Sequence, residues 1–295
     1  MNQVEINLEQ ITLESLPSLS KTGSTRSILR LDKVHPIVSG NKWFKLRYYI
    51  AEALEGKKST IASFGGAFSN HIVALAYACK ALKLESVGFI RGEEAGSITL
   101  QDAAKAGMQL HYISRNDFND KIYLKNLYHQ PDWYWINEGG YGKIGAKGAS
   151  TIFNTVDLNS FTHIVCAVGT GTMMAGLIDA ANCHQQIIGI SVLKNNFSIE
   201  AEVKYLLKKK DQPITIFYDY HFGGYAKHTP LLLNFMNELY LSEALPTDIV
   251  YTGKLMFAVN DLITKKYFGD DANILVIHSG GLQGNRSLAD GKLVF

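Results

Sequence analysis

The sequence predicts an α/β fold in which parallel sheets are covered by helices on both faces. Short apolar segments rich in branched side chains, such as HIVCAVG, alternate along the chain with segments whose apolar residues recur at helical spacing. Residues 46–54 show that spacing, with apolar side chains at 46, 49, 50, 53 and 54. Strands that alternate regularly with helices imply parallel sheets buried on both sides.

The expected elements follow one another in chain order. After the helix over residues 46–54, the apolar run TIASFGG predicts a buried strand, and the apolar spacing after it predicts a helix from Asn70 to Leu82. The same two patterns predict the later elements. We expect strands at residues 86–92, 108–114, 133–140, 162–169, 187–193, 214–220 and 273–281, and helices at 98–106, 117–128, near Thr151, and at 172–181, 199–209, 231–241 and 254–265.

Composition narrows the class of protein. The chain has 295 residues, of which 46% are hydrophobic and 19% charged, and its net charge is +2. That balance supports a full core and gives no reason to expect nucleic acid or a membrane surface as a partner. The 3 cysteines are scattered and match neither a disulfide framework nor a zinc site, so we expect no metal and a reducing, cytoplasmic location. No signal peptide or membrane span is expected.

Glycine-rich segments follow five of the expected strands. They read GGAFSNH, EGGYGKIG, GTGTMMAG, HFGGYAKH and HSGG. In open parallel sheets, ligands bind beyond the carboxyl ends of the strands. Tight turns explain one or two such segments, but five predict one site lined by closely approaching backbone.

The segment VGTGTMMAG carries the clearest chemistry. Glycines at 169 and 171 let backbone N–H groups point at an anion, the next helix adds its positive N-terminal end, and Thr170 and Thr172 add hydroxyl donors. This pattern predicts a phosphate site. It also resembles the start of a dinucleotide fingerprint, which requires an acid at the end of the next strand. That strand ends in Lys194 and Asn195 instead, which argues against a dinucleotide site. The other alternative to a phosphate site is a plain turn between a strand and a helix that binds no ligand.

A lysine near the start of the chain completes this interpretation. Lys42 follows Ser-Gly-Asn and opens the first amphipathic segment. A lysine at a glycine turn together with a compact phosphate site, without metal ligands or a ribose-binding acid, suits pyridoxal 5′-phosphate, whose aldehyde forms a Schiff base with a lysine amine.

The motifs together resemble those of one family. SGNKWFKLRYYIAEAL, SFGGAFSNHIVALAYACKALKL, EGGYGKIGAKG, VGTGTMMAG, VYTGK and HSGG are similar, in that order, to segments of the 1-aminocyclopropane-1-carboxylate deaminase and D-cysteine desulfhydrase family. The likeness runs from about residue 25 to the end of the chain. It implies the tryptophan synthase β-like fold, with two doubly wound domains and the cofactor between them. Residues 46–146 would form the small domain, and residues 1–45 with 147–295 the large one.

The resemblance also implies roles for single residues. Lys42 matches the Schiff-base lysine and would also be the base at the substrate Cα, with Lys45 as the alternative. Ser69 matches the serine that holds the substrate carboxylate, and Tyr225 and Tyr251 match two active-site tyrosines that stack or move a proton. No secure role follows for His71 or Glu138. Cofactor contacts are implied for Asn70, Gly169, Thr170, Gly171, Thr172, Thr252 and Ser279.

Two positions bear on the substrate. Relatives that open the cyclopropane ring have Glu and Leu where this chain has Thr252 and Ser279. A hydroxyl beside the pyridine nitrogen resembles the D-cysteine desulfhydrase branch. Departures near the lysine loop, including Phe44 where Arg is common, leave the substrate open.

The expected function is therefore a lyase that uses pyridoxal phosphate on a small amino acid. D-cysteine, converted to pyruvate, sulfide and ammonia, is the expected substrate, and aminocyclopropane carboxylate is the alternative. A nicotinamide-dependent oxidoreductase and an inactive binding protein are the alternatives from other classes. The resemblance also implies a homodimer.

Overall fold

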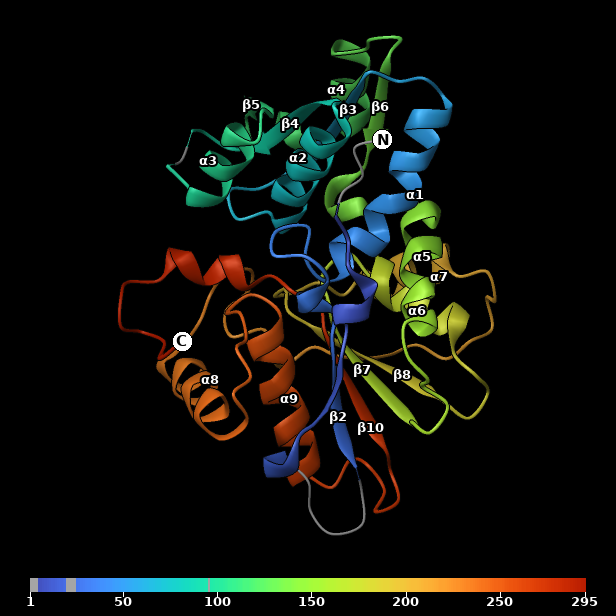
Figure 1. The fold of residues 1–295 in the computed structure, drawn as a ribbon, viewed down its shortest axis with the longest axis vertical. Coiled ribbons are helices and arrows are strands. Elements are labelled where there is room, and N and C mark those ends of the chain that lie inside the picture. Colours follow the sequence, from blue (N-terminus) through green and yellow to red (C-terminus); the bar gives the residue numbers. More distant parts are fainter. Residues whose placement is uncertain (1–4, 20–24, 95) are drawn as a thin grey trace.

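A computed structural model describes residues 5–19, 25–94 and 96–295. The start of the chain, on which the signal-peptide expectation depends, lies partly outside the described residues, as do positions 20–24 of the predicted large domain. Figure 1 shows two α/β units, one above the other, and each consists of a sheet with helices packed against it.

The larger sheet has six strands in the order β1-β2-β10-β7-β8-β9. Neighbouring strands are parallel except β1 and β2, which pair antiparallel. An antiparallel edge strand on an otherwise parallel sheet is common in this class of fold. The strands are β1 (Leu13–Ser15), β2 (Arg26–Arg30), β7 (His163–Val168), β8 (Gln186–Ser191), β9 (Thr215–Phe217) and β10 (Ile274–His278).

The smaller sheet is wholly parallel and has four strands in the order β5-β4-β3-β6. All four fall within the predicted small-domain range of residues 46–146. Its strands are β3 (Thr60–Gly65), β4 (Glu85–Arg91), β5 (Gln109–Ile113) and β6 (Trp133–Ile136).

Helices cover both faces of each sheet, as the alternation along the chain predicts. In β7, Ile164, Cys166 and Val168 pack toward α5, α6 and α7, whereas Val165 and Ala167 pack toward α8 and α9. This alternation follows from the two-residue period of a strand. The helices are α1 (Asn41–Glu55), α2 (Asn70–Leu82), α3 (Ile98–Lys105), α4 (Lys121–Leu127), α5 (Lys143–Ser150), α6 (Thr172–Ala180), α7 (Ile199–Leu206), α8 (Pro230–Glu243) and α9 (Thr252–Thr264).

Besides β1 and β2, which the sequence did not predict, two helices begin well before their expected positions. The helix expected near Thr151 begins instead at Lys143, inside the glycine-rich segment, because Gly145 and Gly148 allow close packing there. A Cβ on Gly148 would lie 1.9 Å from the Phe44 carbonyl oxygen, so α5 packs against α1 at backbone distance. The first helix also begins earlier than expected, at Asn41.

Within the described residues, no helix combines the length and apolar character that crossing a bilayer requires.

Candidate active site

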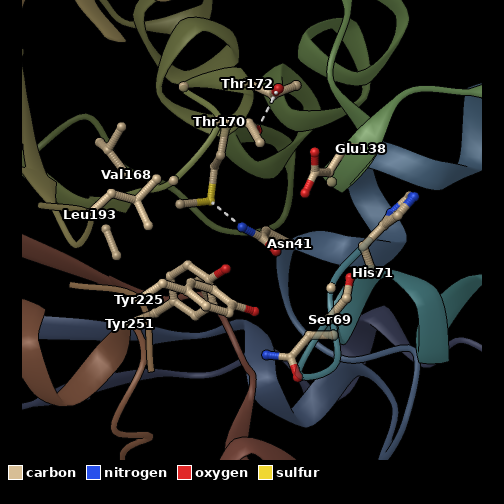
Figure 2. A pocket seen from close by; sticks show the side chains of 18 of the residues that line it. Asn41, Ser69, His71, Glu138, Val168, Thr170, Thr172, Leu193, Tyr225 and Tyr251 are labelled. Carbon is tan, nitrogen blue, oxygen red and sulfur yellow. Dashed lines mark hydrogen bonds between the residues drawn. The ribbon is translucent and has the colours of Figure 1, made fainter. Parts of the chain in front are cut away.

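A cavity of about 590 Å³ lies between the two sheets (Figure 2). Residues from all five predicted glycine-rich segments line it, together with residues from the start of α1. The carboxyl ends of β3, β6, β7, β9 and β10 therefore converge on one site, which is where parallel sheets place their ligands.

Close backbone contact positions Lys42. Gly40 precedes α1 with φ of +62°, and a Cβ at this position would lie 1.9 Å from the Ser279 carbonyl oxygen. The Asn41 N–H also donates to that oxygen, at 3.2 Å. The Ser-Gly-Asn turn and the His-Ser-Gly-Gly segment thus touch each other, and their contact holds the first turn of α1 at the cavity.

The buried Lys42 amine has a lowered pKa and two close neighbours in the cavity. Burial lowers its pKa from 10.5 to about 8, and the Asp248 carboxylate opposes that shift. Its Nζ donates to the Asn41 side-chain oxygen at 2.6 Å and lies 5.6 Å from the centre of the Tyr251 ring. An amine with this pKa is partly neutral near physiological pH, and only the neutral form attacks an aldehyde.

Lys45 places a second amine in the same cavity, one helical turn further along α1. Its Nζ donates to the Gly139 carbonyl oxygen at 2.5 Å. Gly139 in turn packs against Thr170, because a Cβ there would lie 2.9 Å from the threonine methyl group. Burial, followed by the charge of Lys42, holds the Lys45 pKa well below its usual value. The two lysines therefore reach different parts of the cavity.

The predicted phosphate site forms the wall beside Lys45. Gly171 adopts φ of +72° directly before α6, and the Thr170 and Thr172 hydroxyls lie 3.0 Å apart. The first N–H groups of a helix have no partner within the helix and attract anions. Gly169, Thr170, Gly171 and Thr172 all line the cavity.

The start of α2 supplies polar groups from the smaller sheet. Ser69 caps this helix, and its Oγ accepts from the Ile72 N–H at 3.4 Å. Asn70 is 4% exposed and lines the cavity, yet its side-chain oxygen has no hydrogen-bond partner in the described part of the chain. A buried polar atom without a partner indicates a missing ligand group.

His71 turns its ring toward the smaller sheet. The Ser63 hydroxyl donates to the Ile136 carbonyl, so it accepts from His71 Nε2, which lies 2.8 Å away. Burial and the nearby amines of Lys45 and Lys42 hold the His71 pKa well below 6.5. A neutral histidine anchored in this way supports the start of α2.

Two tyrosines form the opposite wall (Figure 2). The rings of Tyr225 and Tyr251 meet edge to face, with centroids 6.4 Å apart. Burial raises the Tyr225 pKa to about 12, and burial together with Tyr225 and Asp248 holds the Tyr251 pKa well above its usual value of 10. Both phenols therefore keep their protons at neutral pH.

The two predicted partners of the pyridine nitrogen lie in different places. Ser279 lines the cavity, but Thr252 does not. The Thr252 hydroxyl donates to Asp248 Oδ1 at 2.6 Å and accepts from the Asp248 N–H at 2.7 Å. The fully buried Asp248 carboxylate also accepts from three backbone N–H groups at the start of α9.

Several functional candidates escaped the sequence analysis. Asp248 precedes the VYTGK motif by two residues, and Lys254 ends that motif, but neither received a role. Glu138 lines the cavity and pairs with Lys121 at 3.1 Å, and its charge adds to the raised pKa values of Tyr225 and Tyr251. Asp248 bonds to residues that lie within four positions of it, so an acid directly before a helix was a usable local signal, whereas the partners of Lys254 are distant in the sequence.

Comparison with known proteins defines the class. The family model described as "Pyridoxal-phosphate dependent enzyme" matches residues 6–280. The chain belongs to this family of enzymes that depend on pyridoxal phosphate, and within it to the group of 1-aminocyclopropane-1-carboxylate deaminases and D-cysteine desulfhydrases.

Individual relatives match over nearly the whole chain. A putative 1-aminocyclopropane-1-carboxylate deaminase of Thermotoga maritima is 30% identical, covering 96% of this chain and 97% of its own. A D-cysteine desulfhydrase of Salmonella paratyphi A is 28% identical, covering 91% of this chain and 90% of its own. The solved structure of an ACC deaminase homologue superimposes with a TM-score of 0.83 at 26% identity, covering 96% of this chain and 93% of its own.

Proposed function

We propose that this cavity binds pyridoxal phosphate through Lys42 and acts on a small amino acid by α,β-elimination. D-cysteine and water would give pyruvate, sulfide and ammonia. The cofactor supplies an electron sink that acidifies the α-proton and lets a β-substituent leave. The remaining work falls to the residues of the chain.

The cavity fits the cofactor at each of its polar groups. Lys42 carries the reactive amine, and the start of α6 with the Lys45 amine suits a phosphate. The unpartnered side-chain oxygen of Asn70 marks an amide that lacks a ligand, and this amide would meet the ring oxygen. Ser279 would meet the pyridine nitrogen.

Substrate handling falls to three groups of the chain. The start of α2 at Ser69 would hold the carboxylate, since helix N-termini offer free N–H groups. The Lys42 amine, with its pKa of about 8, suits a base that removes the α-proton at neutral to mildly alkaline pH. Tyr251, close to that amine, keeps its phenol proton at neutral pH and shares a hydrogen bond with Tyr225, and it would flank the substrate.

One observation carries the choice of D-cysteine. Ser279 lines the cavity with a hydroxyl, and the single carboxylate among the lining residues, Glu138, is paired with Lys121. A neutral partner leaves the pyridine nitrogen largely unprotonated, which makes a weaker electron sink. That sink suffices for expelling a thiolate, whereas opening a cyclopropane ring requires a stronger one. The cyclopropane deaminase is the second candidate, because the Thermotoga maritima relative carries that name.

Two experiments test this proposal: one traps the covalent bond between the lysine and the cofactor, and the other compares two substrates. Protein incubated with pyridoxal phosphate should develop a visible absorbance band that borohydride bleaches, fixing the cofactor to the peptide containing Lys42. Lys42→Ala should lose that adduct, whereas Lys45→Ala keeps the proposed Schiff-base amine and should still form it at saturating cofactor, although the proposed phosphate contact is lost. An adduct that persists in Lys42→Ala refutes the lysine assignment.

The second experiment compares two products. Sulfide release from D-cysteine, with L-cysteine as the stereochemical control, is set against 2-oxobutyrate formation from aminocyclopropane carboxylate. Sulfide from D-cysteine at the higher kcat/KM supports the proposal. The reverse order assigns the protein to the deaminases.

A further inference from the structure

Two loops from different sheets meet at the edge of the cavity. One follows β9 and carries Tyr225, and the other follows β3 and carries Phe68 and Ser69. The Tyr225 hydroxyl donates to the Phe68 carbonyl oxygen at 2.9 Å. This hydrogen bond joins the two halves of the molecule directly beside the residue proposed to hold the substrate carboxylate.

The loop that carries Tyr225 has an unfavourable backbone. Phe222 and Ala226 adopt φ of 49° and 55°, and the two glycines between them adopt φ of 94° and 118°. Positive φ is costly for residues with a side chain, so such a loop persists only where its surroundings hold it.

A buried amine holds this loop. Lys254 in α9 is 0% exposed, and its Nζ donates to the carbonyl oxygens of His221 and Gly224 at 2.9 and 2.7 Å. These carbonyls bracket the turn immediately before Tyr225. Burying an amine is costly unless it is hydrogen-bonded, and here both hydrogen bonds go to this one loop.

We propose that Lys254 and Tyr225 form a latch between the two halves of the active site. Lys254 fixes the loop, Tyr225 reaches across to the Phe68 carbonyl, and the hydrogen bond holds Ser69 in place for the substrate. Both are positioning residues in this assignment. The Tyr225 proton is engaged at the Phe68 carbonyl, and the Tyr225 hydroxyl also forms a hydrogen bond with Tyr251, so Tyr225 links the loop after β3 to the second tyrosine of the site.

Hydrogen exchange of two amides tests the latch without any substrate. The Gly224 N–H donates to His221 within the clamped loop, at 2.9 Å, and the Ser69 N–H donates to Gly66 in the opposite loop, at 3.1 Å. Lys254→Met should speed the exchange of both amides about tenfold, because it leaves two carbonyls without their donor. Tyr225→Phe should speed only the Ser69 amide.

Matched controls separate the latch from general loss of stability. Lys265→Met removes an exposed lysine just beyond the same helix, and Tyr205→Phe removes an exposed phenol on α7, so both should leave the two amides unchanged. An unchanged Ser69 amide in Tyr225→Phe overturns the proposal. If Lys254→Met does not fold, Tyr225→Phe carries the test by itself.

Kinetics provide a second readout, which rests on the proposed function. Loosening Ser69 should raise KM for the amino acid about tenfold in Tyr225→Phe while kcat changes by less than about twofold, since an interaction equal in ground and transition states affects KM alone. A collapse of kcat at constant KM would show that Tyr225 moves a proton, and would overturn the assignment. Absence of all turnover in the unmodified protein would count against the proposed function, while the exchange experiment would still decide the latch.

Discussion

The contact between α1 and α5 offers a sharp test of how the site is built. At Gly148, a Cβ would lie 1.9 Å from the Phe44 carbonyl oxygen and 2.9 Å from its carbonyl carbon. Ordinary contacts begin near 3.4 Å, so the Gly148→Ala substitution requires the two backbones to separate by about 1.5 Å. No rotamer change relieves the clash, because the atoms concerned belong to the backbone.

The magnitude follows from two opposing effects. Overpacking a well-packed core costs about 1–3 kcal/mol, and this case lies at the upper end because a whole helix must move. Alanine recovers about 1 kcal/mol through its better helix propensity and lower unfolded-state entropy. The expected net loss in the free energy of unfolding is therefore about 1–2 kcal/mol.

Urea unfolding, followed by tryptophan fluorescence, measures this loss. The control is Gly96→Ala, where an added Cβ would meet no atom within 4 Å. The same displacement shifts Lys42 and Lys45, so cofactor capture should slow in Gly148→Ala and stay unchanged in the control. Equal unfolding midpoints for the two variants would refute the packing argument.

Three further predictions concern buried charge. Burial lowers the Lys254 pKa to about 8, so between pH 8 and 10 the unfolded chain binds more protons than the folded chain, and stability rises with pH. Over that range, urea unfolding should show that the free energy of unfolding of the wild type increases by about 2 kcal/mol relative to that of Lys254→Met. Asp248→Asn should lower the free energy of unfolding by about 2–3 kcal/mol, because an amide NH₂ would face N–H donors; an unchanged urea midpoint would contradict this. Inorganic phosphate should raise the melting temperature of the wild type more than that of Lys45→Met, and equal shifts would rule out Lys45 as a phosphate ligand.

Sequence reasoning succeeds where the deciding signal is local. The helix Asn70–Leu82 has the bounds that its apolar spacing predicts, since a capping serine and a continuous apolar face define both. It fails for β2, Arg26–Arg30, which reads as polar because arginines flank three residues. Arg30 is nonetheless buried, since Glu14 and Asp32 pair with it at 2.9 and 2.7 Å. Asp32 is a neighbour in the sequence, but Glu14 comes from β1, so only the folded chain shows the full pairing that buries this arginine.

Within the candidate site, too, the predictable residues are those with a local sequence signal. Residues that follow strands were predictable, because the end of a parallel strand marks a ligand site wherever the strand lies. Thr252, which the sequence analysis expected to contact the cofactor, lies outside the cavity lining, because α9 begins at this residue and its hydroxyl bonds to Asp248. Lys254 is legible as a lysine in a motif, but its role depends on two carbonyls some thirty residues earlier in the chain. Every residue has a backbone carbonyl, so the sequence does not show which carbonyls accept a hydrogen bond from a lysine.

The electrostatics of the cavity explain why an anionic cofactor suits this chain. Two lysine amines, Lys42 and Lys45, share the cavity, and each amine is destabilised in its charged form by burial. Glu138 does not balance them, since Lys121 already pairs with it. Asp248 favours the charged form of Lys42, whereas burial and the charge of Lys42 both oppose the charged form of Lys45. If the phosphate binds at the start of α6 as proposed, Lys45 would gain a counter-charge there, and the folding cost of burying this amine would be recovered as binding energy for the cofactor.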